Sequence, residues 1–218
     1  MANVLRAAGW VTGPLADDVF RLCHDDRDGR PLLDGTAVRI GLASALIGEL
    51  GWAGRVAIDG GLLYARPGPP LRDTLAQAAL ADILGEPVRR DLPTWLRYFA
   101  MEAYDRVARR LVAGHHLIPQ RRRRMHRFTG YLPSDRNRHV WPRARLGTSL
   151  GHRRPLSPHD VHLLGIAEAI GLLPIIVDGR GTAAHDWFAA HWESAHPDVQ
   201  ALIGETRAVV GNKVLGRR

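Results

Sequence analysis

The residues with the clearest chemical potential lie in one stretch, "LIPQRRRRMHRFTGYL", at positions 117–132. Four consecutive guanidinium groups repel one another unless water or bound phosphates screen them. These groups belong to Arg121, Arg122, Arg123 and Arg124, and Arg127 follows closely. Large apolar side chains stand beside the charges, namely Met125, Phe128, Tyr131 and Leu132. Three interpretations fit this pattern: a solvated loop, a clamp on nucleic-acid phosphates, or the tip of an element that touches a membrane.

The positive charge of the whole chain is concentrated around this stretch. The 218 residues include 30 Lys and Arg against 22 Asp and Glu. From Arg106 to Arg154 there are 14 arginines and one acid, Asp135, which leaves 16 basic and 21 acidic residues elsewhere. A localised basic field attracts phosphates, on nucleic acids or on lipid head groups. We therefore expect Arg106 and Arg109, on the preceding helix, to belong to the same binding face.

In the nucleic-acid interpretation, a helix followed by a hairpin forms a winged-helix-like element whose arginines lie on DNA phosphates. Binding would then fall with salt, with a slope of ~0.9 for each neutralised phosphate. Neither helix that precedes a hairpin exposes the Asn, Gln and Arg groups that read base edges, and the face from Arg39 to Leu50 is nearly bare of them.

In the membrane interpretation, the arginines flank an amphipathic hairpin tip. The four apolar side chains would enter the interface while the guanidinium groups stay with anionic head groups, each worth ~1 kcal/mol near such a surface. Trp141, which follows Arg136 and Arg138, is a further candidate anchor. This interpretation accounts for both the charges and the apolar residues beside them.

Other kinds of chemistry find little support. Cys23 is the only cysteine, and we expect it to be a small core residue. His159 and His162 are spaced like a metal pair on a helix, but no third ligand stands at a recognisable distance, so we expect a surface pair. For His185, His191 and His196 we expect aromatic packing with solvated rings. Phosphate loops and nucleophile motifs are absent. We predict no metal, no cofactor and no enzymatic activity.

The elements that must position the basic stretch are mainly helical. Apolar periodicity predicts helices at residues 15–22, 39–54, 71–84, 95–112, 156–173 and 183–211, whereas 174–178 is a short strand or a connector. Asp59-Gly60 between two apolar runs predicts a small hairpin, and residues 117–132 stand where a second one falls. We expect one mainly α domain over residues 14–210, with tails at 1–13 and 211–218 and two small β-hairpins, one of them protruding.

The apolar runs are all shorter than the roughly 18 residues that span a bilayer, and the first residues do not have the pattern of a secretory signal. We therefore expect a cytoplasmic protein that associates peripherally with membranes.

The succession of several stretches resembles the Golgi phosphoprotein 3 family. These are "PLADDVFRLCHDDRDGRPL", "GLASALIGELGWAGRVAIDGG", "RPGPPLRDTLAQAAL", "LPTWLRYF", "VARRLVAGHHLIPQRRRR" and "HDVHLLGIAEAIGLL". The resemblance spans roughly Pro14 to Val177 and is closer to the bacterial members. It implies a mostly α-helical domain with a basic face and a protruding hydrophobic hairpin, which corresponds to the segment around Arg124 to Leu132.

The resemblance also implies a function. Eukaryotic members bind phosphatidylinositol 4-phosphate and act as non-enzymatic adaptors that retain protein cargo, and some members self-associate. The partners it implies are therefore an anionic phospholipid or phosphoinositide surface, a protein cargo and a second copy of the chain.

The lipid-pocket positions of the family are not retained here. The pocket tryptophan falls near Leu33 or Asp34, and the pocket arginines fall at Ala43, Met101 and Tyr104. Arg39, Arg97 and Arg106 lie within about one helical turn of these positions. The resemblance thus favours contact with an anionic surface over recognition of one head group.

Overall fold

The computed structural model describes residues 13–120, 130–177 and 182–215, except for the side chains of residues 182–183 and 213–215. Within these residues the chain forms helices and two separate two-stranded sheets, which confirms the mainly α fold class. The elements are α1 (Leu15–Leu22), α2 (Gly35–Trp52), β1 (Val56–Asp59), β2 (Leu62–Ala65), α3 (Thr74–Gly85), α4 (Leu92–Ala100), α5 (Ala103–Ala113), β3 (Leu117–Gln120), β4 (Gly130–Pro133), α6 (Arg136–Gly151), α7 (Pro158–Ala169), α8 (Leu173–Val177), α9 (Thr182–Trp192) and α10 (Pro197–Leu215).

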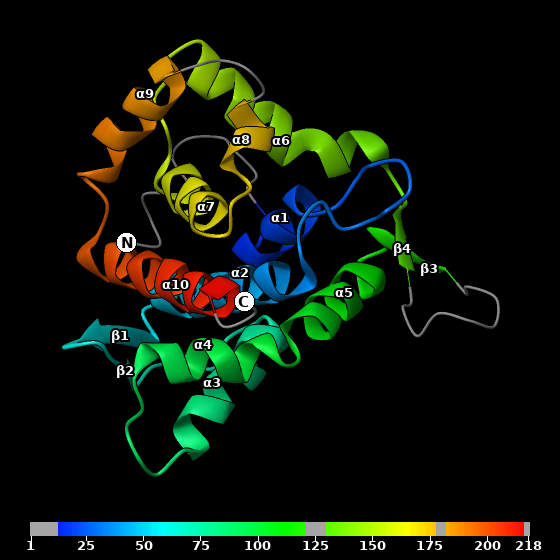
Figure 1. Cartoon of the computed structure of the whole chain (residues 1–218). Coiled ribbons are helices and arrows are strands. Elements are labelled where there is room, and N and C mark those ends of the chain that lie inside the picture. Colours follow the sequence, from blue (N-terminus) through cyan, green and yellow to red (C-terminus); the bar gives the residue numbers. More distant parts are fainter. Residues whose placement is uncertain (1–12, 121–129, 178–181, 216–218) are drawn as a thin grey trace.

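Helix α2 is the centre of the molecule (Figure 1). It contacts α1, α4, α5, α7 and α10, and its residues are buried around the whole circumference from Ile40 to Gly48. The helix begins where the Asp34 carboxylate accepts a hydrogen bond from the Thr36 backbone N–H. At the other end, Gly54 adopts a left-handed φ of +68°, and its N–H and that of Arg55 close a Schellman motif on Gly51 and Leu50. The glycine therefore ends the helix and turns the chain into β1.

The first hairpin forms where Asp59-Gly60 predicts it. Strand β1 pairs antiparallel with β2, with Asp59 opposite Leu62, and both Gly60 and Gly61 have positive φ. Two consecutive residues of positive φ are typical of the tight primed turn that fits the twist of a hairpin.

Helix α5 leads into the second hairpin through the same helix-ending motif. Here the left-handed position is occupied by His115, with φ 58°, while the N–H groups of His115 and His116 bond to Val112 and Leu111. The order of helix, turn and hairpin thus occurs twice, as the sequence predicts, but the second turn places a side chain where glycine is preferred.

The prediction of one helix over residues 95–112 is wrong, because the chain bends at Met101 and Glu102 between α4 and α5. The buried positions Trp95, Phe99, Ala103 and Val107 keep one helical period across the bend, so periodicity could not reveal it. The bend lets both helices pack against α2.

Two further differences concern short or polar elements. Residues 174–178, expected as a strand or connector, contain most of the helix α8, because a short apolar run does not distinguish the two states. Apolar periodicity predicts no helix at α6, which carries Pro142 in its interior and buries His139 and Arg145 along with its leucines. A buried stripe made partly of polar residues has no apolar period to detect.

Helices α7 and α10 complete the packing around α2. Leu163, Ile166, Ala167 and Ile170, within α7 or directly after it, are all buried, and the Thr206 hydroxyl of α10 donates to the Ser44 hydroxyl of α2 at 2.9 Å. None of the described helices combines the length and the apolar content that a bilayer crossing requires.

Candidate functional site

Strands β3 and β4 form a small antiparallel sheet at the edge of the helical body (Figure 1). Leu117 pairs with Pro133, Ile118 with Leu132, and Pro119 with Tyr131. Because side chains alternate between the faces of a strand, Tyr131 and Leu132 point to opposite faces. Leu117 and Tyr131 belong to the face toward the body, and the cross-strand pair Ile118–Leu132 belongs to the other face. Ile118 is 53% exposed, and the sequence interpretation missed it.

The inward face of this sheet rests on an aromatic cluster. The Tyr131 ring lies 6.4 Å from that of Phe20 and 6.3 Å from that of Tyr104, and Phe20 stacks on His24 at 4.1 Å. Burial lowers the pKa of His24 to about 4, so the ring is neutral at pH 7. The cluster fixes the sheet to α1 and α5, and it gives Tyr131 a packing role at its inner edge.

A tight turn between α1 and α2 holds the back of β4. Gly29 in this turn has φ +67°, and a Cβ there would lie 1.8 Å from the carbonyl oxygen of Tyr131. The Asp26 carboxylate forms an ion pair of 2.8 Å with the guanidinium group of Arg136, the first residue of α6. The turn, β4 and α6 are thus held together by a close backbone contact and a salt bridge.

The predicted site residues fall into two groups. Arg121, Arg122, Arg123, Arg124, Met125, Arg127 and Phe128 lie outside the described residues. Among the others, Arg106 pairs with Asp82 at 2.9 Å and with Glu102 at 2.7 Å, whereas Arg109 is exposed and donates to the Asp105 carbonyl. Leu132 is half-buried on the outward face of β4, beside Ile118.

The positions that correspond to the family's lipid pocket differ in their surroundings. Ala43 is fully buried in α2 and Tyr104 is buried in the aromatic cluster, whereas Met101 is 66% exposed. Arg39 and Arg97 are exposed, and Arg106 is occupied by its two carboxylates.

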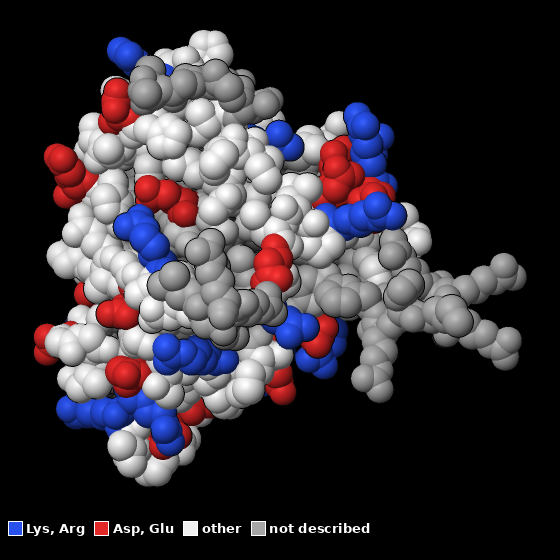
Figure 2. Space-filling view, in the orientation of Figure 1, with Lys and Arg blue, Asp and Glu red and all other residues white. Residues whose placement is uncertain are grey.

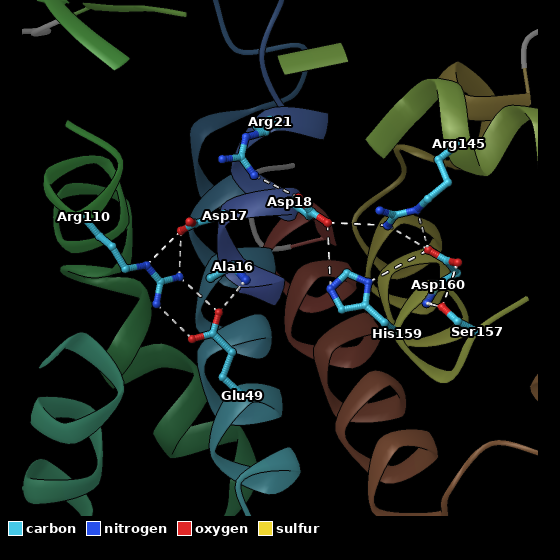
Figure 3. Close-up of polar contacts among 10 residues, drawn as sticks. All are labelled: Ala16, Asp17, Asp18, Arg21, Glu49, Arg110, Arg145, Ser157, His159 and Asp160. Carbon is cyan, nitrogen blue, oxygen red and sulfur yellow. Dashed lines mark hydrogen bonds and ion pairs between the residues drawn. The ribbon is translucent and has the colours of Figure 1, made fainter. Parts of the chain in front are cut away.

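Two arginines of the basic segment are directed into the molecule (Figure 3). Arg110 on α5 forms ion pairs with Asp17 at 2.8 Å, Glu49 at 3.0 Å and Asp73 at 3.2 Å. The Glu49 carboxylate also accepts the Ala16 backbone N–H. Burial raises the pKa of Asp17 to about 6, in spite of the neighbouring Arg110 charge. This cluster ties together α1, α2, α5 and the start of α3.

The second internal arginine, Arg145, connects α6 to α1 and α7. Its guanidinium group lies 2.8 Å from Asp160 and 3.5 Å from Asp18, and Asp18 also pairs with Arg21 (Figure 3). The Asp160 carboxylate accepts a hydrogen bond from the Ser157 hydroxyl. Arg145 and its carboxylates are all less than a tenth exposed. The basic segment therefore supplies structural cations to the acidic part of the chain.

Other arginines of the segment remain at the surface. Arg138, Arg143, Arg153 and Arg154 are exposed, and the described residues place no carboxylate within ion-pair distance of them. Figure 2 shows basic and acidic side chains intermingled on the visible face, with basic groups beside the β3–β4 end and along the lower edge. Within the described residues of the basic segment, these unpaired arginines therefore contribute uncompensated positive charge to the surface.

The expectation of a surface pair at His159 and His162 is wrong, because both rings are buried in α7, at 2% and 1% exposure. Burial lowers the pKa of His162 to about 3. The described residues contain no group of three or more side chains that could hold a metal ion. Helix α7 is buried on nearly every side, which two residues in sequence could not indicate.

Comparisons with known proteins agree with the resemblance in the sequence. The family model for Golgi phosphoprotein 3 (GPP34) matches residues 15–206, from the start of α1 into α10. A search of curated proteins found no match. Because the family model covers most of the chain, the protein belongs to the Golgi phosphoprotein 3 (GPP34) family.

Proposed function

We propose that this member of the Golgi phosphoprotein 3 family is a non-enzymatic, adaptor-type protein that binds peripherally to membranes. The β3–β4 end would contact anionic or phosphoinositide head groups through arginines, and apolar side chains would enter the interface. Family membership supports the adaptor role at the level of the family. A protein cargo and self-association stay predictions.

One observation carries the proposal more than any other. Ile118 and Leu132 form an apolar pair on the face of the sheet that is turned away from Phe20 and Tyr104. The chain between the two strands, residues 121–129, contains five arginines together with Met125 and Phe128. An apolar pair of which Ile118 is exposed and Leu132 half-buried, followed in sequence by a run of cations, is the composition of an interfacial anchor.

The expected strength of attachment is modest. Each arginine near an anionic surface is worth ~1 kcal/mol, and entry of one or two large apolar side chains adds a similar amount. Such binding is reversible, and salt weakens it because head-group attraction is screened over a Debye length of about 8 Å at physiological ionic strength.

Lipid selectivity should follow charge density. The positions of the family's pocket arginines are occupied here by Ala43, Met101 and Tyr104, so a preformed pocket for one phosphate has no support. We expect vesicles containing phosphatidylserine or phosphatidylinositol 4-phosphate, matched for surface charge, to bind within about threefold of each other.

The test compares two double variants in vesicle sedimentation with phosphatidylserine at 0.1 M salt. Ile118→Ser with Phe128→Ser should weaken binding about tenfold or more, because two apolar anchors are lost. The matched control is Leu84→Ser with Val88→Ser, which changes side chains 60% and 63% exposed on the α3 side of the molecule. The control should bind like the parent chain.

Two outcomes would contradict the proposal. Equal binding by all three proteins would show that Ile118 and Phe128 do not anchor the protein to the membrane. Tighter binding to duplex DNA than to vesicles at matched salt, unaffected by Ile118→Ser and Phe128→Ser, would instead favour the winged-helix-like nucleic-acid alternative.

A further inference from the structure

A pocket of ≈ 270 Å³ lies between β2, the end of α3 and the start of α4. These elements lie away from β3 and β4 (Figure 1). The volume is below the range of about 300–1,000 Å³ that is usual for small-molecule sites, and it is nearer the size of one large apolar side chain. Such a pocket suits an anchoring side chain of a larger partner better than a free ligand.

Hydrogen bonds and an ion pair fix the two walls of this pocket. The Leu92 N–H donates to the Gly61 carbonyl at 2.9 Å, and the Leu63 N–H donates to the Arg90 carbonyl at 3.4 Å. Arg90 also forms an ion pair of 3.0 Å with Glu86. The connection from α3 to α4 is therefore held against β2, and the pocket is formed before a partner binds, which lowers the entropic cost of binding.

The walls of the pocket are largely apolar, and part of this apolar surface is open to water. Leu63, Ile83 and Trp95 line the pocket and are buried. Leu84 and Val88 line it as well, yet they are 60% and 63% exposed. Exposed apolar side chains around a concave site with a charged rim are a feature of interaction surfaces.

The charged residues that line the pocket are two arginines and one carboxylate. Arg90 is paired with Glu86, whereas Arg89 has no carboxylate within ion-pair distance among the described residues. The guanidinium carbon of Arg89 lies 4.8 Å from the centroid of the Tyr64 ring. A guanidinium group stacked on a ring keeps its N–H groups in its own plane, where they can donate two parallel hydrogen bonds to a carboxylate. Arg89 is therefore oriented to receive an acidic group.

Two neighbouring arginines extend this positive charge. Arg66 follows the lining residue Ala65, and Arg97 follows Trp95 by two positions on α4. Both are exposed, and the described part of the chain places no carboxylate within ion-pair distance of either. Asp91, in the same region, caps the start of α4. The pocket and its surroundings thus carry an excess of positive charge, and Figure 2 shows basic side chains along this lower edge of the molecule.

We propose that this pocket binds an acidic segment of a protein partner. One large apolar side chain of the segment enters the pocket, and carboxylates on either side of it pair with Arg89, Arg66 and Arg97. A membrane contact requires apolar side chains that project, whereas Leu63 and Trp95 recede into a pocket, so the shape favours a peptide over a lipid surface. This inference is independent of the proposed membrane contact, because it uses neither β3 nor β4.

The test uses the full chain and three labelled peptides of equal length in fluorescence anisotropy titrations at 0.1 M salt. The first peptide has one Phe between two runs of three acidic residues. The second has Ser in place of Phe, and the third has the corresponding amides in place of the acids. We expect the first to bind, and the other two to bind at least tenfold more weakly, because each lacks one of the two features that the pocket recognises.

Two single variants, each with a matched control on α6, locate the binding site. Arg89→Ser should weaken the first peptide about tenfold through the loss of a charge-assisted pair, whereas Arg143→Ser should keep its affinity within about twofold. Leu84→Ser should weaken it about threefold or more, whereas Trp141→Ser, at a position 50% exposed, should bind like the parent chain. All four side chains are exposed, so we expect the variants to fold like the parent chain.

The proposal would be overturned by an absence of binding, by equal affinity for the peptides with Phe and with Ser, or by equal losses in Arg89→Ser and Arg143→Ser. Weaker sedimentation of Leu84→Ser with Val88→Ser on phosphatidylserine vesicles would assign this face to a membrane and contradict a peptide site.

Discussion

Arg109 and Arg110 are adjacent in sequence and have opposite environments. Arg110 is turned inward, with its side chain 13% exposed, against Asp17, Glu49 and Asp73, whereas Arg109 is exposed and, within the described part of the chain, donates to a backbone carbonyl of its own helix. The same division runs through the whole basic segment, with Arg145 inside and Arg138 outside. A run of positive charge in a sequence is therefore not itself a surface, because the fold assigns part of it to interior pairs.

The largest expected effect follows from this difference. Arg110→Met should lower the free energy of unfolding by about 3–5 kcal/mol, because it leaves the buried Asp17 carboxylate and the half-buried Glu49 carboxylate without their cation. Arg109→Met should change it by less than about 0.5 kcal/mol. Urea unfolding of both variants checks this, and equal losses would break the comparison between interior and surface arginines.

A substitution at Gly29 tests how the β3–β4 sheet is held to the helical body. Gly29→Ala places a Cβ against the Tyr131 carbonyl at a left-handed φ, and we expect a loss of about 2–3 kcal/mol as the turn moves off β4. Gly61 also has a positive φ, but a Cβ there would meet open space. Gly61→Ala should therefore lower the free energy of unfolding by about 1 kcal/mol. A smaller loss at Gly29 than at Gly61 in urea unfolding would show that the close contact does not hold the sheet.

The pH dependence of stability should report on the interior and not on the surface arginines, because arginines do not titrate between pH 5 and pH 7. The pKa of His162 is about 3 and that of His24 about 4 in the folded protein, against an ordinary value of 6.5. Their contribution is complete above pH 6.5 and is lost as the pH falls toward these values. Asp17, with its pKa raised to about 6, acts oppositely, since its folded form gains a proton first.

Two histidines outweigh one carboxyl group, so the free energy of unfolding should fall by about 2 kcal/mol from pH 7 to pH 5. His162→Phe should remove most of this fall, because Asp17 nearly offsets the one histidine that remains, whereas His152→Phe, at an exposed position, should leave it intact. Urea unfolding at both pH values measures the slope, and a flat profile in the parent chain would contradict the buried, neutral state of these rings.

The smallest effect concerns the two helix-to-hairpin turns. His115→Gly should raise the free energy of unfolding by about 1 kcal/mol, because glycine adopts the left-handed conformation without steric cost. Gly54→Ala, at the corresponding position after α2, should lower it by a similar amount. If His115→Gly instead destabilises, its side chain makes a contribution at the hairpin end that outweighs the backbone cost.

The sequence was sufficient for elements with clear local signals. Asp59-Gly60 predicted the first hairpin, and the apolar periods predicted α2, α7 and a helical C-terminal end, but not its division into α9 and α10. It was not sufficient where neither the apolar periodicity nor the composition indicates the structure. The bend at Met101 keeps the helical phase, and α6 buries Arg145 against carboxylates that are distant in sequence.

The site was predictable in composition but not in orientation. The arginine run and its apolar neighbours suggested a binding element, yet only strand register separates Tyr131 from Leu132 and adds Ile118. Pairing between distant segments also decides that Arg106 is occupied by Asp82. Such facts depend on tertiary contacts, for which a single sequence gives no pattern.

The proposed membrane contact is tested most directly by moving the same loss of charge between two places. One variant replaces all four arginines from 121 to 124 with Ser. The other replaces with Ser four arginines that are exposed on the β2, α3 and α4 side, namely Arg66, Arg72, Arg89 and Arg97. On phosphatidylserine vesicles, the first should lose roughly a hundredfold in affinity and the second less than threefold. Equal losses would mean that only net charge matters, and they would contradict a binding surface at the β3–β4 end.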